Sequence, residues 1–425
     1  MIQINLKKID EWKDQGADIQ LVSYHLYTSV YDFTPKLSFT YKSSYLTPDT
    51  LGLFIGSSFP ITYNFLSKEN GEEVKTPPKP FTGFCVESFD VHTGDVGLEC
   101  TVKCIADIEF YLVSDLRRSY RNKYGNEVIE DVLNSSSYLK QKQRNIAKTN
   151  NVTTLYRTLG ESDFDFISNQ VLNEYSINLG QPLFYLGLDN TFNFTSINTL
   201  ASSTNKSKVI LKFKNRSDDV SEKFIEKKLK DLTDDNAVTL NTQEAHLQIG
   251  LNESVNNIKN QVFYTNLQTG LITTTAYGLK PGSDQPLFYP IDRLFMSAIK
   301  NSQVTPLFNR PSENISYEVL NLFKGLDQLI TIEAEISNVH QLQHLILAGD
   351  SITVITSYPY SVYNGNYTIT DVEYGQDQTA FFMKVKLSRT AIDTTWTDEL
   401  TEQKENDDFK FPFAPELRKN LLYTV

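Results

Sequence analysis

The chain has 425 residues, enough for about two to four domains of ordinary size. It carries 40 Lys and Arg against 52 Asp and Glu, and the net charge of −12 excludes a protein that wraps nucleic acid with a basic surface. The 26 Phe and 23 Tyr against 3 Met favour strands over a helical bundle. No apolar run is long enough for an export signal or a membrane span, so we expect synthesis and retention in a cytoplasm, with the three cysteines reduced.

The first 112 residues read as a β domain. Between residues 22 and 105, six short apolar runs occur, at 21–30, 36–42, 51–56, 60–65, 81–91 and 97–105, and several of them alternate apolar with polar residues. Six strands in this length predict a small antiparallel barrel or sandwich. The charged, proline-containing stretch 71–80 interrupts the set, and we expect an exposed loop there.

Residues 113–314 change character. Four apolar residues at helical spacing, Val128, Ile129, Val132 and Leu133, predict a short helix. Ser162 and Asp165 resemble a capping box and open a second helical segment that continues to Tyr175. Residues 205–260 are polar, with a helix candidate at 221–232, and strands are expected at 261–267 and 271–279. We therefore predict an α+β domain over 113–205 and a mixed domain over 206–314.

A second β domain is expected over 315–394. Ile330, Ile332, Ala334 and Ile336 share one face of a strand, while Thr331, Glu333, Glu335 and Ser337 share the other. Three further alternating runs follow, at 344–357, 366–374 and 379–391. The last segment, 395–425, begins with an acidic stretch and ends in apolar residues, which suggests a tail that docks on another surface.

Groups with catalytic potential are few. His340 and His344 have metal-ligand spacing, but the glutamate of the HExxH motif is absent. Cys100 and Cys104 alternate with Leu98 and Val102, which predicts buried packing residues. No nucleotide-binding or serine-hydrolase motif occurs. We predict no catalytic, cofactor-binding or metal-binding residue, and no enzyme activity.

One short basic segment, 117–123, stands out in an acidic chain. It contains Tyr120, which has the chemistry to stack on a nucleic-acid base. A segment this brief is more typical of a salt-bridged surface or a subunit contact.

Three stretches carry a family resemblance. Residues 79–134 combine a strand pair with the helix after it, and 153–177 contain Tyr156, Ser162, Asp163, Phe164 and Phe166 at the family's helix positions. The third stretch, 345–374, has a Leu-x-x-Gly-Asp-like turn at Gly349 and Asp350 and an Asn-Gly-x-Tyr-x-Ile pattern from Asn364 to Ile369. In this order they resemble the baseplate hub proteins of contractile-tailed bacteriophages and the hub portion of the valine-glycine repeat spike protein of type VI secretion.

The resemblance implies an α+β, mainly β chain in which two similar antiparallel β-barrel, tail-tube-like domains are joined by mixed α+β domains. It implies a structural virion protein: a homotrimeric central baseplate hub, assembled in the bacterial host cytoplasm. The partners would be a sixfold tail tube protein above, a threefold spike protein below and other baseplate proteins.

The hub would form part of the tail channel, through which DNA passes without specific binding. Glu333 and Glu335 are the candidate channel-lining residues, because acidic groups repel phosphates. The alternatives are a tail enzyme that degrades cell-wall glycan, using a carboxylate pair, and a carbohydrate-binding module with exposed aromatic residues.

Overall fold

The computed structural model describes residues 2–201 with short gaps at 6, 70–71, 76–78, 95–96, 107–110, 113–116, 136–138, 151, 176 and 179–181. It resumes at 207–213, 230, 232–242, 244–249, 330–336, 345–356, 364–377 and 380–389, and it describes the backbone of 261–265, 272–276 and 304–308. The predicted helix at 221–232, the histidines His340 and His344, and the segment 395–425 lie outside or almost wholly outside these residues.

Strands predominate over helices. In chain order the first elements are β1 (Ile2–Asn5), α1 (Lys7–Asp14), β2 (Ile19–Ser29), β3 (Lys36–Ser43), β4 (Ser58–Glu69), β5 (Glu72–Lys75), β6 (Lys79–Gly94) and β7 (Gly97–Ala106). The middle elements are β8 (Arg118–Tyr124), α2 (Gly125–Ser135), η2 (Leu139–Gln141), β9 (Gln143–Ile146), β10 (Val152–Arg157), α3 (Asp163–Phe166), η3 (Ile167–Val171), α4 (Leu172–Glu174), β11 (Pro182–Leu186), β12 (Thr191–Ser196) and α5 (Ile197–Ala201). The rest are β13 (Ser207–Phe213), β14 (Thr233–Thr242), β15 (Glu244–Ile249), β16 (Gln261–Thr265), β17 (Ile272–Ala276), β18 (Val304–Phe308), β19 (Ile330–Ile336), β20 (Ser351–Ile355), β21 (Gly365–Asp377) and β22 (Ala380–Arg389).

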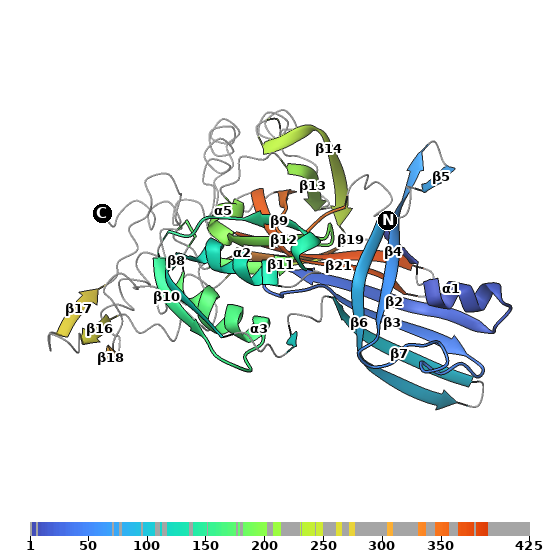
Figure 1. The fold of residues 1–425 in the computed structure, drawn as a ribbon. Coiled ribbons are helices and arrows are strands. Elements are labelled where there is room, and N and C mark those ends of the chain that lie inside the picture. Colours follow the sequence, from blue (N-terminus) through green and yellow to red (C-terminus); the bar gives the residue numbers. More distant parts are fainter. Residues whose placement is uncertain are drawn as a thin grey trace, which may run out of the picture.

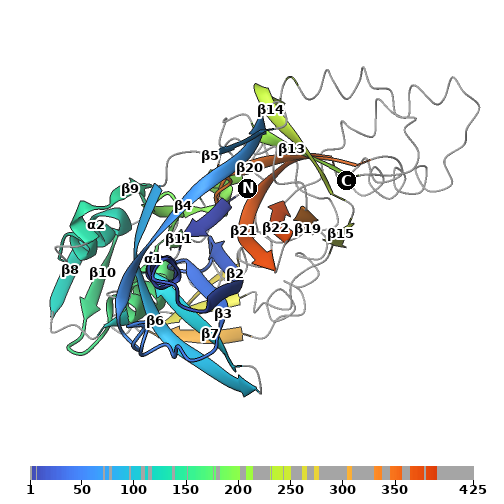
Figure 2. The same cartoon turned by 90° about the vertical axis from the view of Figure 1, so that its right-hand side faces the viewer.

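One 14-stranded sheet unites the two ends of the chain. Eight of its strands follow each other in the order β6-β7-β3-β2-β21-β22-β19-β15, and every neighbouring pair is antiparallel. The junction between the two ends is the pair β2–β21, in which Ser23 to Ser29 face Asp377 to Asp371. Figures 1 and 2 show the blue N-terminal strands beside the orange C-terminal strands in this sheet.

This arrangement confirms a mainly β fold, but the two expected barrels are not confirmed. The described strands of the two β regions hydrogen-bond in one sheet, and among them no barrel closes. Strands β13 and β15, from the region 206–314, pair with β20 and β19 of the last β region, and β14 pairs with β13. Alternation in a sequence shows which face of a strand is buried, but it does not show which strand lies alongside.

Two local predictions in the first β region are wrong. Residues 51–56 form a loop in place of a strand, because Gly52 and Gly56 turn the chain with φ of 71° and 80°. The expected loop 71–80 contains β5 and the start of β6, where Pro80 lies opposite Thr62 of β4. Proline is tolerated there because β7 joins β6 only from Phe84 onward, so the missing N–H has no strand partner on that side.

The middle of the chain contains the helices that the sequence predicts. Helix α2 buries Val128, Ile129, Val132 and Leu133. Ser162 is the N-cap of α3, where its Oγ accepts a hydrogen bond from the Asp165 backbone N–H at 3.0 Å. These helices lie beside the ribbon β8–β10 and the sheet β9-β12-β11, drawn in teal and green in Figure 1.

A continuous apolar core joins this middle domain to the large sheet. Phe33, which follows β2, packs edge-on against Phe164 of α3 at 4.8 Å between ring centroids and against Phe184 of β11 at 5.4 Å. The Leu186 N–H also donates to the Phe33 carbonyl at 2.8 Å. The described helices are all too short or too polar to cross a membrane.

Candidate functional site

One face of the sheet is mostly polar on the strands from β6 to β19. Strand residues that lie directly opposite each other point to the same side of a sheet, so the register identifies the side chains that share this face. Phe382, opposite Gly375, and Ile105, opposite Lys36, are apolar members of the face. Its polar members include Ser88, Asp90, His92, Glu99, Thr101, Lys103, Lys36, Ser38, Thr40, Lys42, His25, Tyr27, Asp371, Glu373, Lys384, Lys386, Glu333 and Glu335. We call this set the polar sheet face.

The two predicted channel residues lie on this face, and both are exposed. Glu333 lies opposite Lys386, with 3.0 Å between its Oε1 and the lysine Nζ. Glu335 lies opposite Lys384, with 3.7 Å between its Oε2 and the Nζ. Each carboxylate therefore has a lysine across the strand pair, which lowers the net negative charge at this point. Their channel-lining role itself stays a prediction.

Polar contacts also cross the junction between the two β regions. His25 Nδ1 lies 2.6 Å from Glu373 Oε1, and the Tyr27 hydroxyl donates to Asp371 Oδ1 at 2.5 Å. Burial and the neighbouring Asp371 raise the pKa of Tyr27 above its ordinary value, so the phenol stays protonated and remains a donor. Side chains on this face thus tie the first β region to the last one.

The first β region continues the same mixture of charges. Lys42 Nζ lies 3.0 Å from Glu99 Oε2, and the hydroxyls of Thr40 and Thr101 are 2.9 Å apart. The ion pairs of Glu99, Glu333 and Glu335 with lysines are all half exposed, so they add little stability. Their effect is to balance the charge of the face locally.

This arrangement does not resemble a catalytic or metal centre. Within the described ranges, no three His, Cys, Asp or Glu side chains are grouped to hold a metal ion. Ser38 lies opposite His25, whose Nδ1 contacts Glu373, but among the described residues no hydrogen bond joins the Ser38 hydroxyl to this imidazole, as a nucleophile and its base would require. What the face offers chemically is an extended, hydrated and nearly charge-balanced surface.

The sequence missed the lysines of this face, although a signal was available. Residues 380–389 alternate in the same way as 330–336, so Lys384 and Lys386 share the polar side of β22. Their pairing with Glu333 and Glu335 depends on which strand lies beside β19, and that information is not local.

Two other predictions about side chains are settled. Cys85, Cys100 and Cys104 are all free and buried, as expected for packing residues, and burial raises the pKa of Cys104 to about 12. In the basic segment, Tyr120 is only 8% exposed, which excludes it as a stacking platform for a base. Arg118 instead forms an ion pair with Asp131, in agreement with a salt-bridged surface.

No family model and no curated protein sequence matches the chain. Several solved structures match the chain, including two tail proteins. The 43 kDa tail protein of prophage MuSo2 from Shewanella oneidensis aligns over 88% of this chain and 98% of its own, with a TM-score of 0.50 and 10% identity. A tail protein from Neisseria meningitidis MC58 aligns over 90% and 97%, with a TM-score of 0.51 and 10% identity. This chain has the fold of bacteriophage tail proteins.

The phage tail fold confirms the resemblance that the three sequence stretches predict. It also agrees with the mainly β composition. At 10% identity the two matches carry no residue-level information, so the polar sheet face must be interpreted from its own geometry.

Proposed function

We propose that the protein is a structural component of a phage tail: a homotrimeric baseplate hub whose polar sheet face lines part of the tail channel. The observation that carries the proposal is the continuous polar face, which runs through both β regions on strands that are all antiparallel. A channel wall needs a broad, hydrated surface without strong local charge, and this face has that character.

The edges of the sheet support assembly with other copies. On β6, the residues from Ser88 to Gly94 pair with β7, and no described strand covers their other side. At the opposite edge, β15 pairs with β19 and with no other described strand. Open strand edges invite pairing with another chain. Three copies that meet at such edges would form a closed ring.

The threefold and sixfold symmetries fit the same scheme. If the regions 1–112 and 315–394 each act as one tube-like unit, three chains present six units around the axis. The ring would then meet a sixfold tail tube protein on one side and a threefold spike protein on the other. In this scheme 113–205 and 206–314 are the connecting α+β domains, 395–425 is a docking tail, and the protein resides in the virion baseplate after assembly in the host cytoplasm.

The balance of charges on the polar sheet face explains how DNA could pass along it. Since each of Glu333 and Glu335 is partnered by a lysine, the wall neither attracts phosphates strongly nor repels them strongly at short range. DNA would pass such a wall without specific contacts. The proposal assigns no catalytic role to any residue.

Light scattering on the purified protein tests the oligomer directly. We expect a mass of about 146 kDa, three times the 48.5 kDa of one chain. A monomer at micromolar concentration would contradict the proposed hub. Cell-wall glycan cleavage or tight glycan binding by such a monomer would favour one of the two alternative functions.

A charge-reversal experiment tests the channel face. In the variant Glu333→Lys/Glu335→Lys, the assembled ring should retain short duplex DNA at low salt, with an affinity that falls steeply as salt rises. The matched control is Glu11→Lys/Asp14→Lys on helix α1, which packs through the buried Ile9 against the apolar core. If both variants bind duplex DNA equally, the polar sheet face is not the channel wall.

A further inference from the structure

The outer side of the ribbon β8–β10 combines exposed apolar and basic groups. Tyr156 of β10 lies opposite Ser119 of β8, and both point away from the buried pair Leu155 and Tyr120. Strand alternation places Arg121 on the same outer side as Ser119, and Arg117 is an exposed residue directly before β8. We call this surface, with Leu159 in the adjoining turn, the ribbon outer face.

The apolar residues here are unusually exposed for their size. Tyr156 is 59% exposed, Leu159 55% and Val152 39%. Arg117 and Arg121 are exposed as well, and neither has an ion-pair partner in the part of the chain that the structure describes. Large exposed apolar side chains grouped with unpaired cations are typical of a contact surface.

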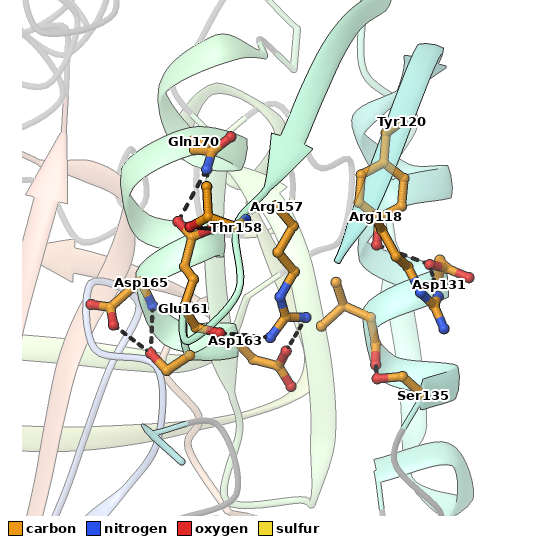
Figure 3. A network of polar contacts seen from close by, with 12 residues as sticks. Arg118, Tyr120, Asp131, Ser135, Arg157, Thr158, Glu161, Asp163, Asp165 and Gln170 are labelled. Atoms are coloured by element: carbon orange, nitrogen blue, oxygen red, sulfur yellow. Dashed lines mark hydrogen bonds and ion pairs between the residues drawn. The ribbon is translucent and has the colours of Figure 1, made fainter. Parts of the chain in front are cut away.

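A buried ion pair fixes this surface in place. Arg157, whose side chain is 1% exposed, lies directly beneath the ribbon outer face, with its Nη1 at 2.5 Å from Asp163 Oδ1 (Figure 3). Its Nη2 donates to the Glu161 carbonyl at 3.1 Å. The Glu161 carboxylate in turn accepts from the Thr158 N–H at 3.1 Å and from Gln170 Nε2 at 3.0 Å. These bonds hold the turn 158–161, so Leu159 is presented on a rigid support.

The other strand of the ribbon is anchored in the same way. Arg118 and the Tyr120 hydroxyl both contact Asp131 of α2, the hydroxyl at 2.9 Å (Figure 3). In the basic segment 117–123, these two residues are therefore directed inward, and Arg117 and Arg121 remain exposed. Among the described strands, β10 pairs only with β8, so its other edge is open to a further strand.

The segment 397–413 of the same chain is chemically complementary to the ribbon outer face. Its acidic residues are Asp398, Glu399, Glu402, Glu405, Asp407 and Asp408, and the aromatic residues that follow them are Phe409, Phe411 and Phe413. Acidic groups complement Arg117 and Arg121, and the phenylalanines complement Tyr156 and Leu159. This segment lies outside the described residues.

The path of the chain favours docking within the same subunit. Strand β22 ends at Arg389, whose Nη1 donates to the Asn364 carbonyl at 2.8 Å beside the start of β21. This end of the sheet abuts the middle domain, since Gly349, which bonds to Ile369 of β21, also contacts Tyr185 of β11. Nine further residues reach Asp398, a span of up to about 30 Å when extended.

We propose that the segment 397–413 docks on the ribbon outer face of its own subunit, with its carboxylates on Arg117 and Arg121 and its phenylalanines against Tyr156 and Leu159. The proposal is independent of the hub function, because it concerns contacts inside one chain.

Hydrogen exchange on the full-length protein tests the contact. Neutralising the six acidic residues, Asp to Asn and Glu to Gln, should speed amide exchange in residues 152–157 about tenfold, because the docked segment no longer covers β10. Exchange in β12 should not change. The variant Arg121→Glu/Tyr156→Ser should give the same loss of protection in residues 397–413, while Lys103→Glu/Tyr45→Ser, at exposed positions elsewhere, should give none.

Carbodiimide cross-linking identifies which copy supplies the segment. The reagent joins carboxylates to lysines, and Lys123 and Lys148 are exposed beside the ribbon. In protein refolded from an equal mixture of 14N- and 15N-labelled chains, so that one assembly contains both labels, links from these lysines to residues 398–408 should join residues of the same label only. Mixed-label links would overturn docking within one subunit, and unchanged exchange in the neutralised variant would overturn the contact altogether.

Discussion

The buried pair Arg157 and Asp163 allows a quantitative test of how the ribbon is held. The replacement Asp163→Asn leaves a guanidinium that is 1% exposed without its counter-charge. The gross attraction between the two charges at 2.5 Å is about 7 kcal/mol for an effective dielectric constant of 20. Most of this is offset by desolvation, and breaking one side of a buried pair costs about 3 to 5 kcal/mol. We expect about 3 kcal/mol, since the bond to the Glu161 carbonyl survives.

Hydrogen exchange of β10 is the suitable assay, because a chain with several domains does not unfold in two states. A loss of about 3 kcal/mol raises the opening equilibrium roughly 100-fold, so the residues 152–157 should exchange faster by that factor. The variants Arg157→Met and Arg157→Met/Asp163→Asn complete a double-mutant cycle, in which the double variant should lose about 2 kcal/mol less than the sum of the single losses. Additive losses, or a change below about 1 kcal/mol in Asp163→Asn, would refute the assignment of this pair as the anchor.

The remaining predictions concern the cores of the two β regions. Replacing Cys100 and Cys104 by Ala should lower the free energy of opening of β7 by about 1 kcal/mol per site, measured by hydrogen exchange, and bound zinc that is lost in the double variant would contradict the packing role. Gly349→Ala should destabilise the protein by about 1 to 3 kcal/mol, because the φ of Gly349 is +96° and a Cβ would collide with the buried hydroxyl of Tyr185. The control is Gly160→Ala, where φ is +84° but a Cβ would meet no other atom, so that only the backbone strain is introduced. Burial raises the pKa of Asp350 above its ordinary 3.8, so ionisation of this carboxyl opposes folding. In thermal melts, the stability of the wild type should fall relative to that of Asp350→Asn as pH rises from about 3.8 through the raised pKa. A stability difference between the two proteins that is constant with pH would argue against a buried carboxylate.

Local pattern explains what the sequence predicted well. The alternation around Cys100 and Cys104 fixes their burial, because strand geometry alone sends every second side chain inward. The same holds for the apolar face of α2 and for the cap at Ser162, each of which depends on residues within one or two turns.

Local patterns could not predict which strands, far apart in the sequence, pair with each other. Glu333 was correctly expected on a polar strand face, but its neighbour Lys386 is 53 residues away, so the face appeared acidic when β19 was considered alone. The same limit applies to β13 and β15. Their polar sequence does not show that they pair with β20 and β19, which supply backbone hydrogen bonds that these strands need.

The junction β2–β21 has a consequence for biosynthesis. The contact between His25 and Glu373 joins residues 348 positions apart, so at about 5 to 20 residues per second β2 waits roughly 20 to 70 s on the ribosome for its partner strand. During this interval the N-terminal strands present an unsatisfied edge to every other nascent copy. Chains that terminate before β21 should therefore collect in aggregates, and slow translation or chaperone retention of the first β region would raise the yield of native protein.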